Sequence, residues 1–292
     1  MGDKNNGACR SRQRAIFAAP FASREYRGSG VSARPRFSAG GREWGVRPAL
    51  SKIAGAVLGS CRGIGVSAVS VAAAAPQGLT RPRAILFDWD NTLVDSWMTI
   101  HEALNAVMAA MEKPLWSLRE TKERVRLSLR ESFPLHFGER WEEAREIYLD
   151  VFRTIHLDRL NPLPGRGELL RALVAEDIFL GVVSNKTGAL LRCEAARIGW
   201  PELFGSMIGA GDAAQDKPNP APVALALRPS GIGPGEGVWL VGDTGTDMEC
   251  AYNSGCIPVL LGNGATEEEF VRCEPRLVFP DGASLFHFVR GL

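Results

Sequence analysis

The sequence predicts an α/β fold, with a doubly wound parallel sheet as its core and an all-helical segment inserted into that core. Two observations predict it. From Arg83 onward, short apolar runs alternate with helical stretches, which is typical of parallel strands linked by helices. Between Asp95 and Pro164 the chain has no strand signal and only amphipathic stretches, so this segment is expected to be helical throughout.

Three runs have the continuous apolar character of strands that are buried on both faces: residues 84–87, 178–183 and 238–241. Weaker strand candidates are residues 206–209, 257–261 and 276–279. The inserted segment has the apolar spacing of helices over residues 97–112, 117–131 and 139–157. We therefore expect a core domain formed by residues 83–94 and 164–292, and a helical cap formed by residues 95–163.

The leading segment, residues 1–82, shows no sustained helical or strand period and is expected to be disordered. Through Arg83 the chain holds 14 Lys or Arg against 3 Asp or Glu, whereas the remainder holds 20 against 30. Such a composition is typical of a mitochondrial or plastid transit peptide, and it also fits upstream sequence translated through a misplaced start. We favour the second interpretation, which predicts a cytoplasmic protein. Without interleaved aromatic residues, the basic segment is not expected to bind nucleic acid.

Several classes of protein are disfavoured by the composition. The six cysteines form no CxxC pair, and no spacing with the four histidines indicates zinc, so free thiols in a reducing compartment are expected. Arg62 interrupts the longest apolar candidate, residues 53–75, so we expect no membrane span and no membrane partner.

Polar residues follow each of the three strongest strands at the point where the strand ends. Asp88 follows the first strand, Ser184 the second, and Asp243 the third, with Asp90 and Asp247 a few residues further on. In an open parallel sheet the ligand crevice lies outside the carboxyl ends of the strands, so these side chains are expected to converge there. Crowded carboxylates resist ionisation unless a cation is present. A hard divalent ion is the expected partner, and Mg²⁺ suits a site that must also hold phosphate oxygens.

Four motifs occur in a characteristic order along the chain. They are DxDxT at Asp88, Asp90 and Thr92, then Ser184 followed by Asn185, then Lys217 before a proline, and GDxxxD at Gly242, Asp243 and Asp247. Over roughly residues 84–289, this set resembles the haloacid dehalogenase superfamily, and within it the phosphoglycolate phosphatase-like group. The resemblance implies a Rossmann-like core with a cap inserted after the first strand.

The resemblance also implies a role for each matched residue. Asp88 is the implied nucleophile, which forms an aspartyl-phosphate, and Asp90 the acid that protonates the leaving oxygen and then activates water. The implied phosphate-binding residues are Ser184, Asn185 through its backbone, Lys217 and Thr92, of which Thr92 is expected to order the turn. The implied magnesium ligands are Asp88, Asp90 through its backbone carbonyl, Asp243 and Asp247.

A second acid in DxDxT favours phosphoryl transfer to water, because relatives that cleave carbon–halogen bonds lack an acid at the position of Asp90. The expected function is therefore a Mg²⁺-dependent phosphatase acting on a small phosphorylated acid, sugar or nucleotide. A phosphomutase and a non-catalytic phosphate-binding module remain alternatives. The implied partner is the small substrate alone, and the protein is expected to be a monomer or homodimer.

Four basic residues of the cap, Arg124, Arg126, Arg130 and His136, are candidate substrate anchors. Charge on such helices is more often a solvated face, and this is the interpretation that we favour for them.

Overall fold

A computed structural model describes residues 79–262, 270 and 273–292 of the chain. The prediction of disorder for the leading segment falls mainly on residues 1–78, which lie outside the described residues. Within the described part, Leu79 packs against the core, and Arg81 pairs with Glu176 at 2.6 Å. The described fold therefore begins before the predicted boundary at Arg83.

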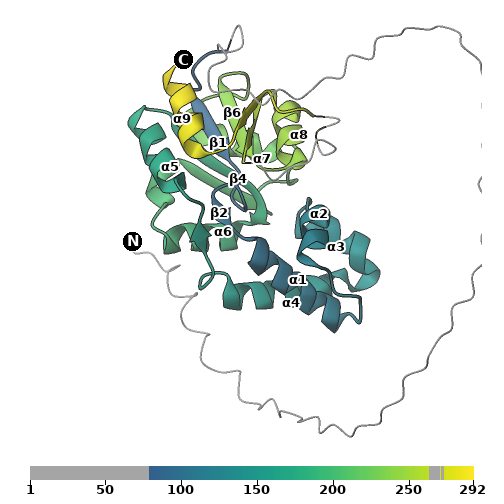
Figure 1. Ribbon diagram of the computed structural model, residues 1–292. Coiled ribbons are helices and arrows are strands. Elements are labelled where there is room, and N and C mark those ends of the chain that lie inside the picture. Colours follow the sequence, from purple (N-terminus) through teal and green to yellow (C-terminus); the bar gives the residue numbers. More distant parts are fainter. Residues whose placement is uncertain (1–78, 263–269, 271–272) are drawn as a thin grey trace, which may run out of the picture. The chain divides into compact units, whose positions relative to one another are not determined.

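Six parallel strands form the sheet, in the order β5-β4-β1-β6-β7-β8 (Figure 1). The strands are β1 (Ala84–Phe87), β4 (Phe179–Thr187), β5 (Ser206–Ala210), β6 (Val238–Gly242), β7 (Ile257–Leu261) and β8 (Leu277–Phe279). The first strand, β1, lies in the middle of the sheet. From it the chain winds outward through β4 and β5, and then continues on the other side of β1 through β6. This is the doubly wound order, so the prediction of fold class is confirmed.

Alternate side chains of β1 point to two different helix layers. Ile85 and Phe87 join the apolar cluster that includes residues of α5, α6 and α9, whereas Ala84 and Leu86 join the cluster that includes residues of α7 and α8. The helices are α5 (Arg166–Ala175), α6 (Gly188–Arg197), α7 (Ala221–Leu227), α8 (Gly245–Asn253) and α9 (Gly282–Arg290), with 3₁₀ turns at Pro201–Leu203 and Arg228–Ser230. Burial on both faces explains why the strands are apolar along their whole length.

Four helices lie between β1 and α5 (Figure 1), and α1, α3 and α4 supply most of a second apolar cluster, which also includes Leu190 of α6. They are α1 (Trp97–Ala110), α2 (Leu118–Arg124), α3 (Leu129–Phe137) and α4 (Trp141–Ile155), with a 3₁₀ turn at Gly138–Arg140. A short antiparallel ribbon of β2 (Val94–Asp95) and β3 (Asn161–Pro162) lies where the chain leaves and re-enters the core. We refer to residues 97–155 as the helical insertion.

The prediction of one continuous helix over residues 117–131 is wrong. The helix ends at Arg124, Val125 takes an extended conformation, and a new helix begins after Ser128. The intervening loop is tied to the core, because the Thr246 hydroxyl donates to the backbone carbonyl of Arg126 at 3.1 Å. Tertiary contact therefore overrides a helical pattern that local sequence supports.

Among the described residues, no helix combines the length and the apolar character that crossing a lipid bilayer would require.

Candidate active site

The carboxyl ends of β1 and β6 place two predicted site residues side by side. These strands pair in register, with Phe87 opposite Val241, and the Asp88 amide donates to the Val241 carbonyl at 2.8 Å. Asp88 and Asp243 thus leave the sheet at neighbouring points. The strand order reverses here, which is where open parallel sheets form their ligand crevice.

Three carboxylates gather at this point: oxygens of Asp88, Asp243 and Asp247 lie within 4.8 Å of one another. The Asp247 side chain packs directly against the backbone of Gly242, which is possible because Gly242 has no side chain. A Cβ at position 242 would lie 2.2 Å from the Asp247 Cγ. Oxygen donors in this arrangement suit a hard divalent cation. These residues therefore fit the metal site that the sequence predicts, while the Asp90 side chain lies outside this cluster.

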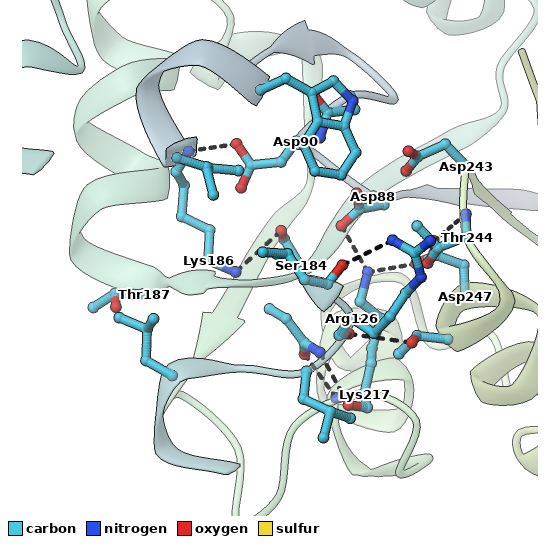
Figure 2. A pocket seen from close by; sticks show the side chains of 18 of the residues that line it. Asp88, Asp90, Arg126, Ser184, Lys186, Thr187, Lys217, Asp243, Thr244 and Asp247 are labelled. Atoms are coloured by element: carbon cyan, nitrogen blue, oxygen red, sulfur yellow. Dashed lines mark hydrogen bonds and ion pairs between the residues drawn. The ribbon is translucent and has the colours of Figure 1, made fainter. Parts of the chain in front are cut away.

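Lys217 is the cation that the protein itself supplies to the cluster. Its buried ammonium donates to Asp88 and to Asp247, each at 2.6 Å. Burial opposes the charged form of the lysine, but the two carboxylates outweigh it and raise the pKa of Lys217 above its ordinary value. Figure 2 shows the lysine between the two acids, below Asp243.

Two acids of the cluster, Asp88 and Asp243, are hard to ionise while no metal is bound. Burial raises the pKa of Asp88 to about 6, against the opposing effect of Lys217. Burial also raises the pKa of Asp243 well above its ordinary value, and the charges of Asp247 and Asp88 add to the rise. One lysine thus leaves the three acids short of positive charge, and a divalent cation would supply it.

The three other residues of the predicted phosphate set lie in different surroundings. Ser184 lines the pocket at the carboxyl end of β4, and its hydroxyl accepts from the Lys186 amide at 3.3 Å. The Asn185 side chain instead makes two 3.0 Å hydrogen bonds with the backbone of Lys217. Thr92 is fully buried, and its hydroxyl donates to Asp243 at 3.1 Å. The side chains of Asn185 and Thr92 thus orient Lys217 and Asp243, which leaves the expected phosphate contact of Asn185 to its backbone.

Asp90 has a partner that sequence reasoning missed. Its carboxylate lies 2.5 Å from the ammonium of Lys186, which is buried and also lies 3.0 Å from Glu194. Glu194 accepts further hydrogen bonds from the Trp89 indole at 2.7 Å and the His156 ring at 2.8 Å. The available signals were a lysine shortly after the apolar part of β4 and one acid on the buried face of α6.

The helical insertion closes the other side of the pocket, a cavity of about 120 Å³. It contributes mainly apolar side chains, namely Trp97, Ile100, Val125, Leu127, Leu129, Tyr148 and Phe152. Arg126 lines the same pocket, and Figure 2 shows its guanidinium pointing into the space between Ser184 and Asp247. The expectation of a solvated position therefore does not hold for Arg126.

Arg130 connects the helical insertion to the loop that carries Lys217. Its guanidinium donates to both oxygens of the buried Asp216, at 2.5 and 2.6 Å, and Asp216 also accepts from the Gly211 amide. A bidentate pair of this kind fixes the relative orientation of the two groups. Because Asp216 precedes Lys217, the insertion and the lysine loop are held together.

A family model described as haloacid dehalogenase-like hydrolase matches residues 85–260 of this chain, which include every residue of the pocket. The chain belongs to the haloacid dehalogenase-like hydrolase family. The match confirms the resemblance that the four motifs indicate, and it makes the protein a hydrolase of this family.

Individual relatives agree with this assignment. Phosphoglycolate phosphatase of Rhodospirillum rubrum is 30% identical over 218 residues, which is 70% of this chain and 89% of that protein. A haloacid dehalogenase-superfamily hydrolase from Ehrlichia chaffeensis is 29% identical, with a TM-score of 0.51 over 73% of this chain and 98% of that one. CbbY from Rhodobacter sphaeroides, solved in complex with phosphate, shares the fold at 21% identity, with a TM-score of 0.60 over 70% of this chain and 96% of that one.

Proposed function

We propose that this family member is a Mg²⁺-dependent phosphatase, which hydrolyses a small organic phosphomonoester through an aspartyl-phosphate on Asp88. The observation that carries the proposal is the convergence of Asp88, Lys217, Asp243 and Asp247 at one edge of the sheet. A phosphoryl group brings further negative charge to this point, and the site is built from groups that tolerate it only together with a cation.

In the proposed reaction Asp88 attacks phosphorus, and the bond to the leaving oxygen breaks while Asp90 gives that oxygen a proton. Asp90 then takes a proton from the water that hydrolyses the aspartyl-phosphate. Lys217 keeps its proton and balances the charge of Asp88 and of the transferred group. When bound, Mg²⁺ would be held by Asp88, Asp243 and the Asp90 backbone carbonyl, with Asp247 in support, and would stabilise charge on the phosphoryl oxygens.

We also propose that the helical insertion acts as a cap over the reaction, with its boundaries near residues 95 and 163. Its apolar side chains exclude water from the pocket, and its loop to α3 brings Arg126 to the phosphate side. An arginine in this place suits a substrate with a second anionic group, because a guanidinium binds a carboxylate with two parallel hydrogen bonds. Together with the names of the curated relatives, this favours a small phosphorylated acid such as 2-phosphoglycolate.

A screen of small phosphomonoesters tests the proposal, with phosphate release measured in Mg²⁺ and in EDTA. We expect turnover in Mg²⁺ alone, with 2-phosphoglycolate ahead of ethyl phosphate, and a smaller advantage in Arg126→Met. Binding of these phosphates without turnover would contradict the proposal and favour a binding module. A requirement for a bisphosphate activator, with product isomerisation, would favour a mutase.

Metal binding is expected to depend on pH. Mg²⁺ needs the ionised acids, and burial raises the pKa of Asp88 to about 6 and that of Asp243 well above its ordinary value, so affinity should rise with pH through about 6. In EDTA, where no metal is bound, the stability of the protein depends on pH in the opposite direction. Protonated Asp88 contributes stability that is fully present below the ordinary pKa of an aspartate and is lost as pH rises through about 6. The gain in melting temperature from Mg²⁺ should therefore be larger at about pH 8 than at about pH 5. An equal gain at both pH values would contradict this account.

A further inference from the structure

The side chain of Asp90 is held by a lysine that has no part in the proposed mechanism. The ammonium of Lys186 contacts one oxygen of Asp90 at 2.5 Å, and both residues line the pocket. Figure 2 shows the lysine side chain extending from β4 to Asp90, on the opposite side of Ser184 from Lys217. The two buried lysines thus serve different acids: Lys217 contacts Asp88 and Asp247, and Lys186 contacts Asp90.

Lys186 is itself fixed from several sides. Its ammonium lies 3.0 Å from the Glu194 carboxylate and 4.8 Å from the centre of the Phe152 ring. Glu194 is in turn held by hydrogen bonds from His156 and Trp89, and all of these side chains are buried. A lysine with this many partners has little freedom to move away from Asp90.

The same glutamate also holds the backbone on which Asp90 lies. Trp89 immediately precedes Asp90, is fully buried, and donates its indole N–H to Glu194 at 2.7 Å. Glu194 therefore acts on Asp90 by two routes, through the Lys186 ammonium and through the Trp89 indole. An acid that must reach one oxygen of a bound substrate gains from such positioning, since a displacement of about 1 Å can cost about 100-fold in rate.

We infer that Lys186 is a positioning residue for Asp90, which holds the carboxyl group where it can protonate the leaving oxygen, with Glu194 as its support. This inference rests on the proposed function. Lys186 neither gives nor takes a proton: the proton moves from Asp90 to the leaving oxygen as the phosphorus–oxygen bond breaks. A purely structural ion pair would affect all substrates alike, whereas a residue that positions the acid matters only for leaving groups that need a proton.

Two phosphates of similar size separate these cases. The glycolate oxygen of 2-phosphoglycolate needs a proton on departure, whereas acetyl phosphate releases acetate without one. In Lys186→Met, kcat/KM for 2-phosphoglycolate, or for the best alkyl phosphate of the screen, should fall by about 100-fold, and for acetyl phosphate by less than about tenfold. The quantity kcat/KM reports on leaving-group departure even where hydrolysis of the aspartyl-phosphate limits kcat.

Arg192→Met is the matched control. Arg192 is a cation on the same helix as Glu194, and it pairs with Asp212 and not with Asp90. The substitution should leave the ratio of the two kcat/KM values unchanged. If Lys186→Met does not fold, the double variant Lys186→Met/Glu194→Gln removes the more buried of the two carboxylates that lose their cation, and the same selective loss is expected. Equal losses on both substrates would overturn the inference alone, whereas a wild type that hydrolyses no phosphomonoester would overturn the proposed function.

Discussion

Asp88→Asn should abolish phosphatase turnover, with a loss of at least about 10³-fold, because the amide cannot attack phosphorus. The fold should persist. In the metal-free protein the pKa of Asp88 is raised to about 6 by burial, so a neutral side chain removes an acid that is costly to ionise there. Lys217 keeps Asp247 as its partner in the variant. Phosphate release, measured with Mg²⁺ at saturating substrate, checks the expected loss.

Asp150→Asn is the matched control for this substitution. Asp150 carries the same side chain, lies exposed on α4 and pairs only with Arg153 among the ion pairs of the described residues. Its replacement should leave turnover unchanged. An Asp88→Asn protein that is folded by circular dichroism and retains more than about a tenth of wild-type turnover would contradict the assignment of the nucleophile.

Lys217→Met should weaken both catalysis and stability. Turnover should fall by about 10² to 10³-fold, because Asp88 and the transferred group lose the ammonium that contacts Asp88. In EDTA the free energy of unfolding should fall by roughly 3 to 5 kcal/mol, because the buried carboxylates of Asp88 and Asp247 lose their partner. The destabilisation should be smaller in Mg²⁺, since the metal supplies positive charge to the same acids. Urea unfolding with and without Mg²⁺ measures both values.

The exposed Lys113 offers the corresponding control. Lys113→Met changes the same side chain in the helical insertion and should alter the free energy of unfolding by no more than about 0.5 kcal/mol, with or without metal. A Lys217→Met protein whose stability is equally reduced in EDTA and in Mg²⁺ would show that the lysine and the metal do not act on the same carboxylates.

Much of the core and of the site's location could be predicted from the sequence, because strands buried on both faces are apolar throughout and each ends abruptly. Asp88 and Asp243 mark two of those ends, and parallel pairing then brings them to one edge. The strand predicted to end at residue 183 instead continues past Ser184 to Thr187. The predicted convergence of Asp88 with Asp243 depends on strand order, which the alternating pattern indicates. Local sequence signals are sufficient for Asp88 and Asp243, because the two strands that they follow are neighbours in the sheet and pair in register.

Other contacts could not be predicted, because they depend on side chains that meet across long stretches of sequence. Lys186 reaches Asp90 from 96 residues further along the chain, and no local pattern indicates which acid a buried lysine will meet. The loop at Arg126 interrupts a good helical pattern because Thr246 binds it from the core. The Asn185 side chain binds the backbone of Lys217, 32 residues further along the chain, and no local pattern indicates that contact. In each case a distant partner determines the position of the side chain.

Trapping the covalent intermediate is the most direct test of the account. The enzyme is mixed with 2-phosphoglycolate or the best substrate of the screen, quenched during turnover, and treated with borohydride, which reduces an acyl phosphate to an alcohol. Peptide mass mapping should then find homoserine in place of Asp88 in the wild type, and unchanged sequence without substrate. Reduction at another carboxylate would contradict the assignment of Asp88 as the nucleophile. The assignment would also be contradicted if the wild type turned over the substrate while neither the wild type nor Asp90→Asn yielded a reduced residue.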